Sequence, residues 1–310
     1  MLDTDRLRVL AEVARTGAIA RAAERLGCTA AAASQQISRL ERETGAVLLE
    51  RSARSVRLTE AGRVLATHAE RVFAELDAAD QAVRAVAGVA GGRLRVASFA
   101  TSRGFVVPAL AAFARRHPGI ELDFVEMEPE HALPAVRAGN VDVAVAHRYA
   151  QLQMPDLRGL RETPLHREAL LVAVPARLAP ATDEAVHLQQ FADAPWGSTL
   201  ATNGYQAVTE LACYAAGFEP RVDFRADSYD LLLALVGIGF GVALVPALVA
   251  RPAAGIRFLE IAQPSGLARD LQAVTRRADT SPAAVAMIDC LTRQLRHRRP
   301  SSPSRARTDS

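Results

Sequence analysis

A seam of small and apolar residues between positions 65 and 86 constrains the fold more than any other feature of this sequence. The spacing alternates between four and three residues over Leu65, Ala69, Val72, Leu76, Ala79, Val83 and Val86. This a/d pattern predicts one helix over residues 59–86, about 42 Å long at 1.5 Å per residue. Glycines at 88, 91 and 92 would end it as a hinge. The 310-residue chain is too long for one ordinary core, so we expect two or three domains joined through this linker.

The residues before the linker predict three helices. One covers about residues 4–15, and a buried stripe over residues 19–26 indicates a short second helix. Gly27 stands where a helix end favours glycine, and Thr29 can cap a third helix over residues 29–42. Two short helices joined by a glycine turn, the second with a polar outer face, are typical of a helix-turn-helix that reads the major groove of DNA. A plain three-helix bundle with a solvated polar face fits the spacing equally well.

The next segment favours the DNA-binding alternative. Apolar runs at residues 47–49 and 56–58 flank a turn rich in arginine and serine, which predicts a β-hairpin wing. Singly, each arginine of the hairpin is most simply a solvated surface charge, but three on one hairpin suit phosphate or minor-groove contact. The residues expected to contact DNA are Thr29, Ala31, Ser34, Gln35, Ser38, Arg39, Arg51, Arg54 and Arg57.

These N-terminal residues resemble the LysR-type transcriptional regulators. The motifs that carry the resemblance are Thr16-Gly17-Ala18, Ala22-Ala23-Glu24-Arg25-Leu26, Ser34-Gln35-Gln36-Ile37-Ser38-Arg39-Leu40-Glu41, Leu48-Leu49-Glu50-Arg51 and Leu58-Thr59-Glu60-Ala61-Gly62. The resemblance implies a sequence-specific DNA-binding regulator that is not an enzyme. Its expected partners are double-stranded operator or promoter DNA, a small-molecule effector, further copies of itself and, as a candidate, RNA polymerase.

The linker seam is expected to be a dimer interface. An isolated helix cannot bury such a stripe, so a partner helix from a second subunit is implied, through Leu65, Ala69, Val72, Leu76, Ala79 and Val83. The alternative is packing of the stripe on the protein's own second domain. We favour a homodimer that pairs into a homotetramer, because a two-fold dimer combines two DNA half-sites and so makes one weak reading head specific.

From Arg93 onward, predicted strands and helices alternate. Strands are expected at residues 94–98, 120–125, 141–146, 169–174, 222–224 and 241–245, and helices at residues 105–116, 130–138, 203–216 and 229–236. Such alternation predicts mostly parallel sheets covered by helices. Two lobes of this kind bring ligands to the carboxyl ends of their strands, at the crevice between the lobes.

The resemblance continues into this part of the chain. Gly139-Asn140-Val141-Asp142-Val143-Ala144 and Gly239-Phe240-Gly241-Val242-Ala243-Leu244-Val245-Pro246 look like the LysR-type effector-binding domain, whose fold is similar to periplasmic solute-binding proteins. The implied order is a winged helix-turn-helix over residues 1–58, the linker helix and hinge over 59–90, and an α/β effector-binding domain over 91–297. That domain would consist of two Rossmann-like subdomains, one over about 91–163 and 267–297 and the other over about 164–266.

Topology places polar residues at the predicted crevice. The residues expected near the effector are Ser98, Thr101, Ser102, Glu128, His147, Trp196, Thr199 and Thr202. Hydroxyls and free N–H groups at two helix starts would suit a carboxylate or another polar ligand. The threonines and Ser102 can equally be helix caps, Trp196 a core residue and His147 a surface residue. Glu128 and His147 disfavour a strongly anionic ligand unless Arg148 or the helix ends compensate.

Other functional classes fit less well. The sequence has no catalytic motif and no metal-ligand spacing, so we expect neither an enzyme nor a cofactor. Residues 291–310 hold six Arg and one Asp, so the excess positive charge belongs to a tail, and residues 298–310 are expected to be disordered. The remaining alternative is a solute-binding or enzymatic α/β protein with an N-terminal interaction bundle. The charged N-terminus is no signal peptide, which argues against a transport role and favours the cytoplasm.

Overall fold

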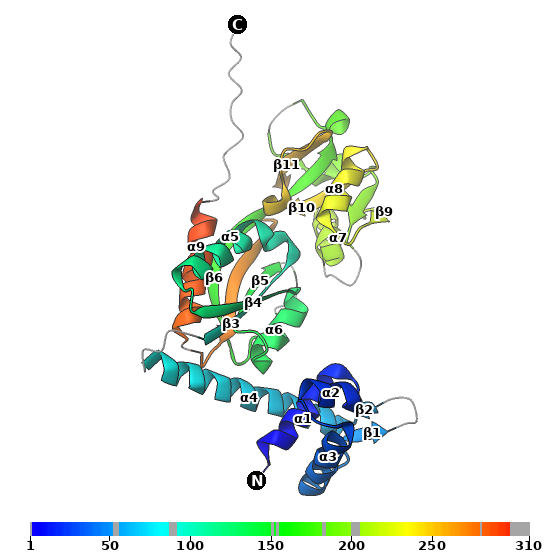
Figure 1. Ribbon diagram of the computed structural model, residues 1–310. Helices are drawn as coiled ribbons and strands as arrows, with labels where there is room; N and C mark the ends of the chain where they lie inside the picture. The colour runs from blue at the N-terminus through cyan, green and yellow to red at the C-terminus, as the bar shows by residue number, and fades with distance from the viewer. Residues whose placement is uncertain are drawn as a thin grey trace. The chain divides into compact units, whose positions relative to one another are not determined.

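The computed structural model describes residues 2–51, 56–86, 92–149, 152, 155–181, 184–199, 205–279 and 281–297. It divides into an N-terminal unit, which includes the long helix and with which residues 134–141 are grouped, and a C-terminal unit (Figure 1). The predicted hinge glycines 88 and 91, the wing residue Arg54, Thr202 and the tail over 298–310 lie outside the described residues. No helix in the described ranges is long and apolar enough to cross a bilayer.

The N-terminal unit is a three-helix bundle with a hairpin and a long helix. Its elements are α1 (Thr4–Thr16), α2 (Ile19–Arg25), α3 (Ala30–Thr44), β1 (Leu49–Arg51), β2 (Val56–Leu58) and α4 (Glu60–Val86). The Asp3 carboxylate caps α1 by accepting from the backbone N–H groups of Asp5 and Arg6, and Gly17 ends the helix at φ 68°. The core includes Leu10, Ile37 and Leu40, all inaccessible to solvent. The predicted winged helix-turn-helix is confirmed.

Two side chains hold the hairpin and the start of α4 against this bundle. Glu41 Oε1 accepts from the backbone N–H groups of Leu48 and Leu49, at 2.9 and 3.3 Å, and so ties α3 to β1. Thr59 caps α4, accepting from Gly62 N at 3.0 Å while donating to Val47 O at 2.7 Å. A Cβ at Gly62 would lie 2.1 Å from the carbonyl oxygen of Leu48, so only glycine fits there. These contacts fix how the hairpin enters the long helix.

The C-terminal unit is an α/β structure with a mixed sheet. Its strands are β3 (Gly92–Ser98), β4 (Ile120–Glu126), β5 (Val143–Tyr149), β6 (Leu160–Pro175), β7 (Val186–His187), β8 (Trp196–Ser198), β9 (Val222–Arg225), β10 (Val242–Pro246), β11 (Ile256–Gln263) and β12 (Ala268–Arg276). Its helices are α5 (Arg103–Arg116), α6 (Pro129–Ala138), α7 (Tyr205–Ala215), α8 (Tyr229–Gly237) and α9 (Pro282–His297), with short 3₁₀ turns such as η1 (Ala100–Ser102) and η5 (Ala247–Val249).

Separate hydrophobic clusters define two lobes in this unit: one cluster belongs to the first lobe and two belong to the second. In one lobe β3 pairs in parallel with β4 and β5, and α5 and α9 pack against it around Phe113 and Met287 (Figure 1). In the other, β8 pairs in parallel with β9 and β10, and its core includes Trp196 and Leu244. The predicted two-lobed α/β architecture is confirmed.

The expectation of mostly parallel sheets is wrong for the middle of the unit. The long strand β6 pairs antiparallel with β12 over residues 160–169 and antiparallel with β10 and β11 over residues 170–175. A single strand therefore belongs to both lobes. The apolar pattern predicts only residues 169–174 of β6, because the first half of the strand is rich in charged residues and shows no apolar run.

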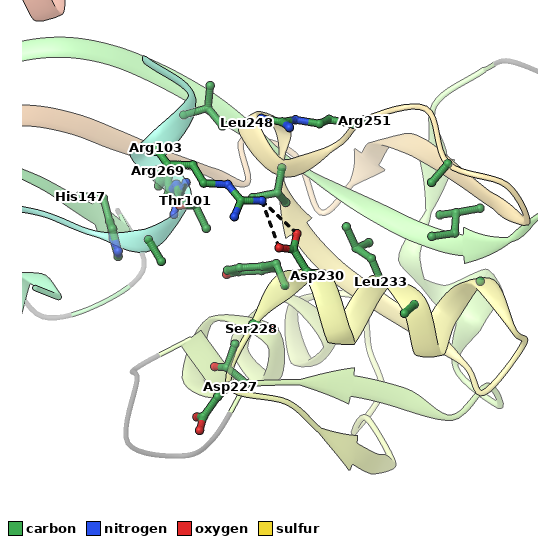
Figure 2. A pocket seen from close by; sticks show the side chains of 18 of the residues that line it. Thr101, Arg103, His147, Asp227, Ser228, Asp230, Leu233, Leu248, Arg251 and Arg269 are labelled. Carbon is green, nitrogen blue, oxygen red and sulfur yellow. Dashed lines mark hydrogen bonds and ion pairs between the residues drawn. The ribbon is translucent and has the colours of Figure 1, made fainter. Parts of the chain in front are cut away.

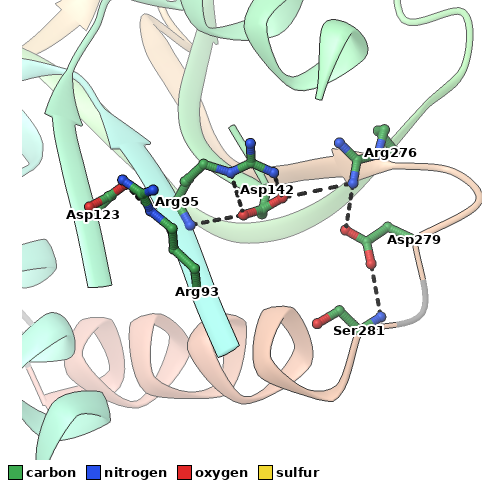
Figure 3. A network of polar contacts seen from close by, with 7 residues as sticks. All are labelled: Arg93, Arg95, Asp123, Asp142, Arg276, Asp279 and Ser281. Atoms are coloured by element: carbon green, nitrogen blue, oxygen red, sulfur yellow. Dashed lines mark hydrogen bonds and ion pairs between the residues drawn. The ribbon is translucent and has the colours of Figure 1, made fainter. Parts of the chain in front are cut away.

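A buried carboxylate explains one of the family-like motifs. Asp142, which is 3% exposed, precedes β5 and accepts from the backbone N–H of Arg95 at 2.9 Å. It also accepts from Arg95 Nε at 3.1 Å and Nη2 at 2.9 Å, and it lies 3.8 Å from Arg276 Nη2 (Figure 3). Asp142 thus joins β3, β5 and β12 and has a structural role.

Candidate DNA-binding surface and ligand cavity

Helix α3 has one face in the core and one face in solvent. Ala33, Ile37 and Leu40 are fully buried at helical spacing. The N-cap Thr29 and the five α3 residues predicted to contact DNA lie on the other face. Thr29, Ala31, Gln35 and Arg39 are exposed, and Ser34 and Ser38 are half-buried.

The start of α3 is ordered by its own cap. Thr29 Oγ1 accepts from the backbone N–H of Ala32 at 3.1 Å, so the hydroxyl is already used once inside the helix. Ala30 and Ala31 follow without long side chains. This end of the helix therefore combines exposed backbone N–H groups with little steric bulk, a combination that favours close approach to phosphate.

The hairpin carries one arginine whose side chain the structure describes. β1 and β2 pair antiparallel, with Glu50 opposite Arg57, and the Arg57 side chain is exposed. Arg51 ends β1. Arg54 is outside the described residues.

The predicted dimer seam divides into two parts along α4. Ala69 is 1% exposed and Leu65 is partly buried, and both pack against the core of their own N-terminal unit. The bundle therefore already covers Ala69 and leaves it no surface for a partner helix, whereas Leu65 keeps part of its surface accessible. Further along, Val72 is 42%, Leu76 52% and Val83 67% exposed, and Ala79 is exposed too. These four residues form an apolar stripe on the surface of the N-terminal unit.

The C-terminal unit contains a cavity of about 620 Å³ (Figure 2). One wall is polar and comes mainly from the carboxyl ends of β3, β4 and β5 and from β12; it includes Thr101, Glu126, Glu128, His147, Tyr149 and Arg269. The opposite wall is mostly apolar and comes from α8, η5 and the segment that leads to β11; it includes Leu233, Ala234, Ile238, Leu248, Val249, Pro252 and Ile256. A cavity of this size with an apolar wall and a few convergent polar groups suits a small organic molecule.

A buried ion pair, which we call the floor of the cavity, lies at its polar wall: Arg269 lines the cavity, and Glu168 lies behind it, outside the lining. Arg269 and Glu168 are each 1% exposed, and Arg269 Nε donates to Glu168 Oε1. Arg269 Nη2 donates to Thr101 Oγ1 at 2.7 Å, and Glu168 Oε2 accepts from the backbone N–H of Leu248 at 2.8 Å. The guanidinium carbon also lies 5.1 Å from the centre of the Phe99 ring. The pair therefore joins η1, β6, β12 and η5, which come from both lobes.

Glu128 and His147 form a second pair on the polar wall, with 3.4 Å between Glu128 Oε2 and His147 Nε2. Burial lowers the pKa of His147 more than the neighbouring carboxylate raises it, so the imidazole is neutral at neutral pH. Burial also raises the pKa of Glu128, but the hydrogen bond from His147 and the charge of Arg269 outweigh this and lower it overall. The pair is therefore a carboxylate that accepts from a neutral imidazole.

Four of the eight predicted effector residues line the cavity, and three others do not. Thr101, Glu128, His147 and Thr199 contribute to its walls. Ser98 is fully buried beneath the surface and shares a hydrogen bond with Ser102, which in turn donates to Phe99 O at 2.6 Å. Trp196 is a core residue of β8 whose indole N–H donates to Phe191 O at 3.0 Å. The hydrogen-bonding groups of these side chains are used to close turns, so they do not face the cavity.

The placement of His147 also differs from the prediction. The apolar pattern predicts His147 and Arg148 after the third strand, whereas both lie within β5. The cause is β12, which pairs Leu271 with His147 and Asp270 with Arg148 and so lengthens β5. Antiparallel pairing to a strand more than a hundred residues away leaves no local pattern in the sequence.

Sequence reasoning missed most of the remaining lining. Arg269 and Glu168 could have been suspected only because charged residues directly adjoin buried strands. Arg103 at the start of α5 and Asp230 in the first turn of α8 form an ion pair of 3.1 Å at the cavity (Figure 2). Within the described residues, no group of three or more His, Cys, Asp or Glu is placed to hold a metal ion.

Two protein families match consecutive parts of the chain. Residues 4–63 match the bacterial regulatory helix-turn-helix proteins of the lysR family, and residues 87–296 match the LysR substrate binding domain. The second match alone covers more than half of the chain, and the boundary between the two lies in the long helix.

Named relatives extend over nearly the full length. The chain is 30% identical over 296 residues to the HTH-type transcriptional regulator IlvR of Caulobacter vibrioides, covering 94% of this chain and 98% of that protein. It is 31% identical over 265 residues to the HTH-type transcriptional regulator TfdS of Cupriavidus pinatubonensis, covering 84% and 88%.

Solved structures share the fold. CbnR, a LysR family transcriptional regulator, superposes with a TM-score of 0.63 at 23% identity, over 94% of this chain and 99% of that one. A full-length OxyR variant from Pseudomonas aeruginosa gives a TM-score of 0.73 at 20% identity, over 94% and 95%. With the winged helix-turn-helix, the two-lobed α/β unit and these matches in hand, the protein belongs to the LysR family: it is a DNA-binding transcriptional regulator with an effector-binding domain, not an enzyme.

Proposed function

We propose that the outer face of α3 and the wing hairpin bind the operator, with α3 in the major groove. The observation that carries this proposal is the division of α3 into a fully buried face and an outer face whose hydrogen-bonding side chains are exposed or half-buried. Gln35, with one donor and one acceptor, and Arg39, with two adjacent donors, suit base edges, whereas Arg57 on the wing suits phosphate. Because the proposed partner is DNA, we also place the protein in the cytoplasm.

The exposed stripe over Val72, Leu76, Ala79 and Val83 would pair with the same stripe of a second copy. A two-fold dimer explains how two α3 helices occupy two half-sites about one helical turn apart. Pairing of dimers into a tetramer belongs to the same proposal.

The cavity of the C-terminal unit is the proposed effector site. Its walls come from both lobes, so a ligand that contacts both would stabilise one arrangement of the lobes over another. A coupling free energy of about 1–3 kcal/mol between ligand and DNA is sufficient for regulation.

A cavity-filling variant tests this assignment. Ala234 on α8 lines the cavity and is exposed, so Ala234→Trp would occupy the space without disturbing a core. Leu231→Trp adds an indole to the same helix outside the cavity lining and serves as the control. We expect metabolites that raise the Tm and alter the operator footprint to act on the wild type and on Leu231→Trp, but not on Ala234→Trp. Metabolites that act equally on Ala234→Trp would show that the effector binds outside this cavity.

A further inference from the structure

The charged side chains around the cavity are unevenly matched. Two of its three arginines are committed, Arg269 to Glu168 and Thr101, and Arg103 to Asp230. Arg251 is exposed at the rim. On the other side stand three carboxylates, Glu126, Glu128 and Asp227, none of which forms an ion pair with an arginine among the described residues, although the charge of Arg269 acts on Glu128 from further away. The open part of the cavity therefore carries more negative than positive charge.

Glu128 is the deepest of these three carboxylates. Its side chain is 40% exposed and accepts hydrogen bonds from His147 and from the backbone at Ala100, whereas Glu126 and Asp227 are exposed residues. Because burial keeps the His147 imidazole neutral, this contact orients the carboxylate without cancelling its charge. An anionic oxygen with remaining lone pairs thus faces a half-enclosed space, where a cationic donor binds more strongly than in bulk water.

An unpartnered hydroxyl gives independent evidence for a polar ligand atom. Thr199 lines the cavity and is 4% exposed, and its Oγ1 has no hydrogen-bond partner among the described residues. A buried hydroxyl without a hydrogen-bond partner destabilises the fold by about 1–3 kcal/mol, so native proteins rarely leave such a group without a partner. A ligand that carries N–H donors would satisfy its oxygen.

The opposite wall determines the rest of the ligand. Leu233, Ile238, Leu248, Val249 and Ile256 offer hydrocarbon surface and no charge. A molecule bound between the two walls needs a polar end and an apolar body, because an entirely polar solute would not remove the apolar wall from water.

We propose that the effector carries a protonated amine, with the ammonium group at Glu128 and an apolar body against α8 and residues 248–256. This inference rests on the proposed effector site and deepens it by naming the ligand class. Simple amines and zwitterionic amino acids share the ammonium group, and Arg251 is the one lining arginine of the described chain that could receive an amino acid's carboxylate.

The test uses probes that differ only in the polar end. 2-Phenylethylamine, phenylalanine and 3-phenylpropanoate share one apolar body, and 3-methylbutylamine, leucine and 4-methylpentanoate share another. Each is titrated calorimetrically into the full-length wild type, into Glu128→Gln and into Ala234→Trp. Glu130→Gln is the matched control, because it removes the same charge two residues away from an exposed position outside the cavity lining.

We expect at least one ammonium probe to bind the wild type and Glu130→Gln equally. Glu128→Gln should weaken that binding about tenfold or more, since it replaces a charged acceptor with a neutral one. Binding of the simple amine without the amino acid, or of both, identifies which source the site accepts.

Other results would overturn the inference. Tighter binding of a carboxylate probe than of its amine counterpart, undiminished amine binding to Glu128→Gln, or binding of no ammonium probe each contradict the ammonium assignment. If a carboxylate probe binds and Ala234→Trp abolishes its binding, the cavity remains the effector site and only the ligand class is wrong. If every bound probe also binds Ala234→Trp unchanged, the effector site itself has been misplaced.

Discussion

The outer face of α3 and the floor of the ligand cavity both consist of polar side chains, but the two regions hold them differently. On α3, Gln35 and Arg39 are exposed, and the helix backbone positions them. In the cavity, Arg269 and Glu168 are each 1% exposed and are held by one another, by Thr101 and by a backbone N–H. Substitutions on α3 should therefore act separately, whereas a substitution in the floor should disturb every member of the network.

The largest effect is expected from Glu168→Ala. It leaves the Arg269 guanidinium buried without its carboxylate, which typically costs about 3–5 kcal/mol of unfolding free energy. Urea denaturation of the full chain measures this loss. Glu168→Gln keeps an acceptor in place and should lower the unfolding free energy by less. A change below about 1 kcal/mol for Glu168→Ala would show that the buried pair contributes no more than an exposed ion pair does.

Leu76→Asp should come next, with an effect on assembly and not on folding. Leu76 is 52% exposed in the single chain, so the unit itself tolerates the charge. At a dimer seam, two buried carboxylates would cost about 3 kcal/mol or more. Sedimentation velocity should show monomers with an unchanged circular dichroism spectrum. Ala69→Asp, at the buried end of the same stripe, should instead lower the Tm. If the mass of Leu76→Asp in sedimentation equals that of the wild type, the stripe is not the dimer interface.

A change in sequence preference is expected from Gln35→Ala. Loss of a bidentate base contact costs about 1–3 kcal/mol at one position of the operator and leaves other positions unaffected. Selection from random duplexes with the wild type and the variant measures this directly. An identical preferred sequence would exclude Gln35 from base recognition.

Arg57→Ala should weaken binding to all duplexes by a similar factor. A phosphate contact carries no sequence information, and its loss should reduce the slope of log affinity against log salt by about 1. Affinities for operator and scrambled duplexes between about 50 and 200 mM salt test this. A loss confined to the operator would mean that Arg57 reads bases.

The smallest effect on folding is expected at the other ion pair of the cavity. Arg103 and Asp230 are 62% and 73% exposed, so solvent screens their attraction. Arg103→Ala should change the unfolding free energy by about 0–1 kcal/mol in the same urea experiment. A loss as large as that of Glu168→Ala would break the contrast between exposed and buried polar groups.

Periodicity is sufficient to predict the N-terminal unit. The helices expected over residues 4–15, 19–26, 29–42 and 59–86 agree with α1 to α4 to within a few residues, because each buries one stripe and carries its own cap or glycine end. The same periodicity makes the stripe of α4 look uniform and does not reveal that the bundle covers its first turns. That distinction depends on which element packs against each part of α4 in the folded structure.

The C-terminal unit shows where local patterns fail. β11 and β12 and most of β6 pair antiparallel with distant segments, and their charged residues interrupt the apolar runs that mark a buried strand. α9 is missing from the predicted elements although Ala284, Met287, Leu291 and Leu295 have helical spacing. At the cavity, Glu128 and His147 are predictable because they follow the parallel-paired residues of β4 and β5, whereas Arg269 and Glu168 come from strands whose pairing no local pattern reveals.

The exchange of partners along β6 has a consequence for how this chain tolerates insertions. Successive side chains of a strand point to opposite faces, so one extra residue between positions 169 and 170 would invert one half of β6 with respect to the other. Either half could keep its inward-facing residues, but not both at once, and no loop intervenes to absorb the extra length. We expect length variation among relatives to be excluded from this point and to gather where the chain turns at the surface.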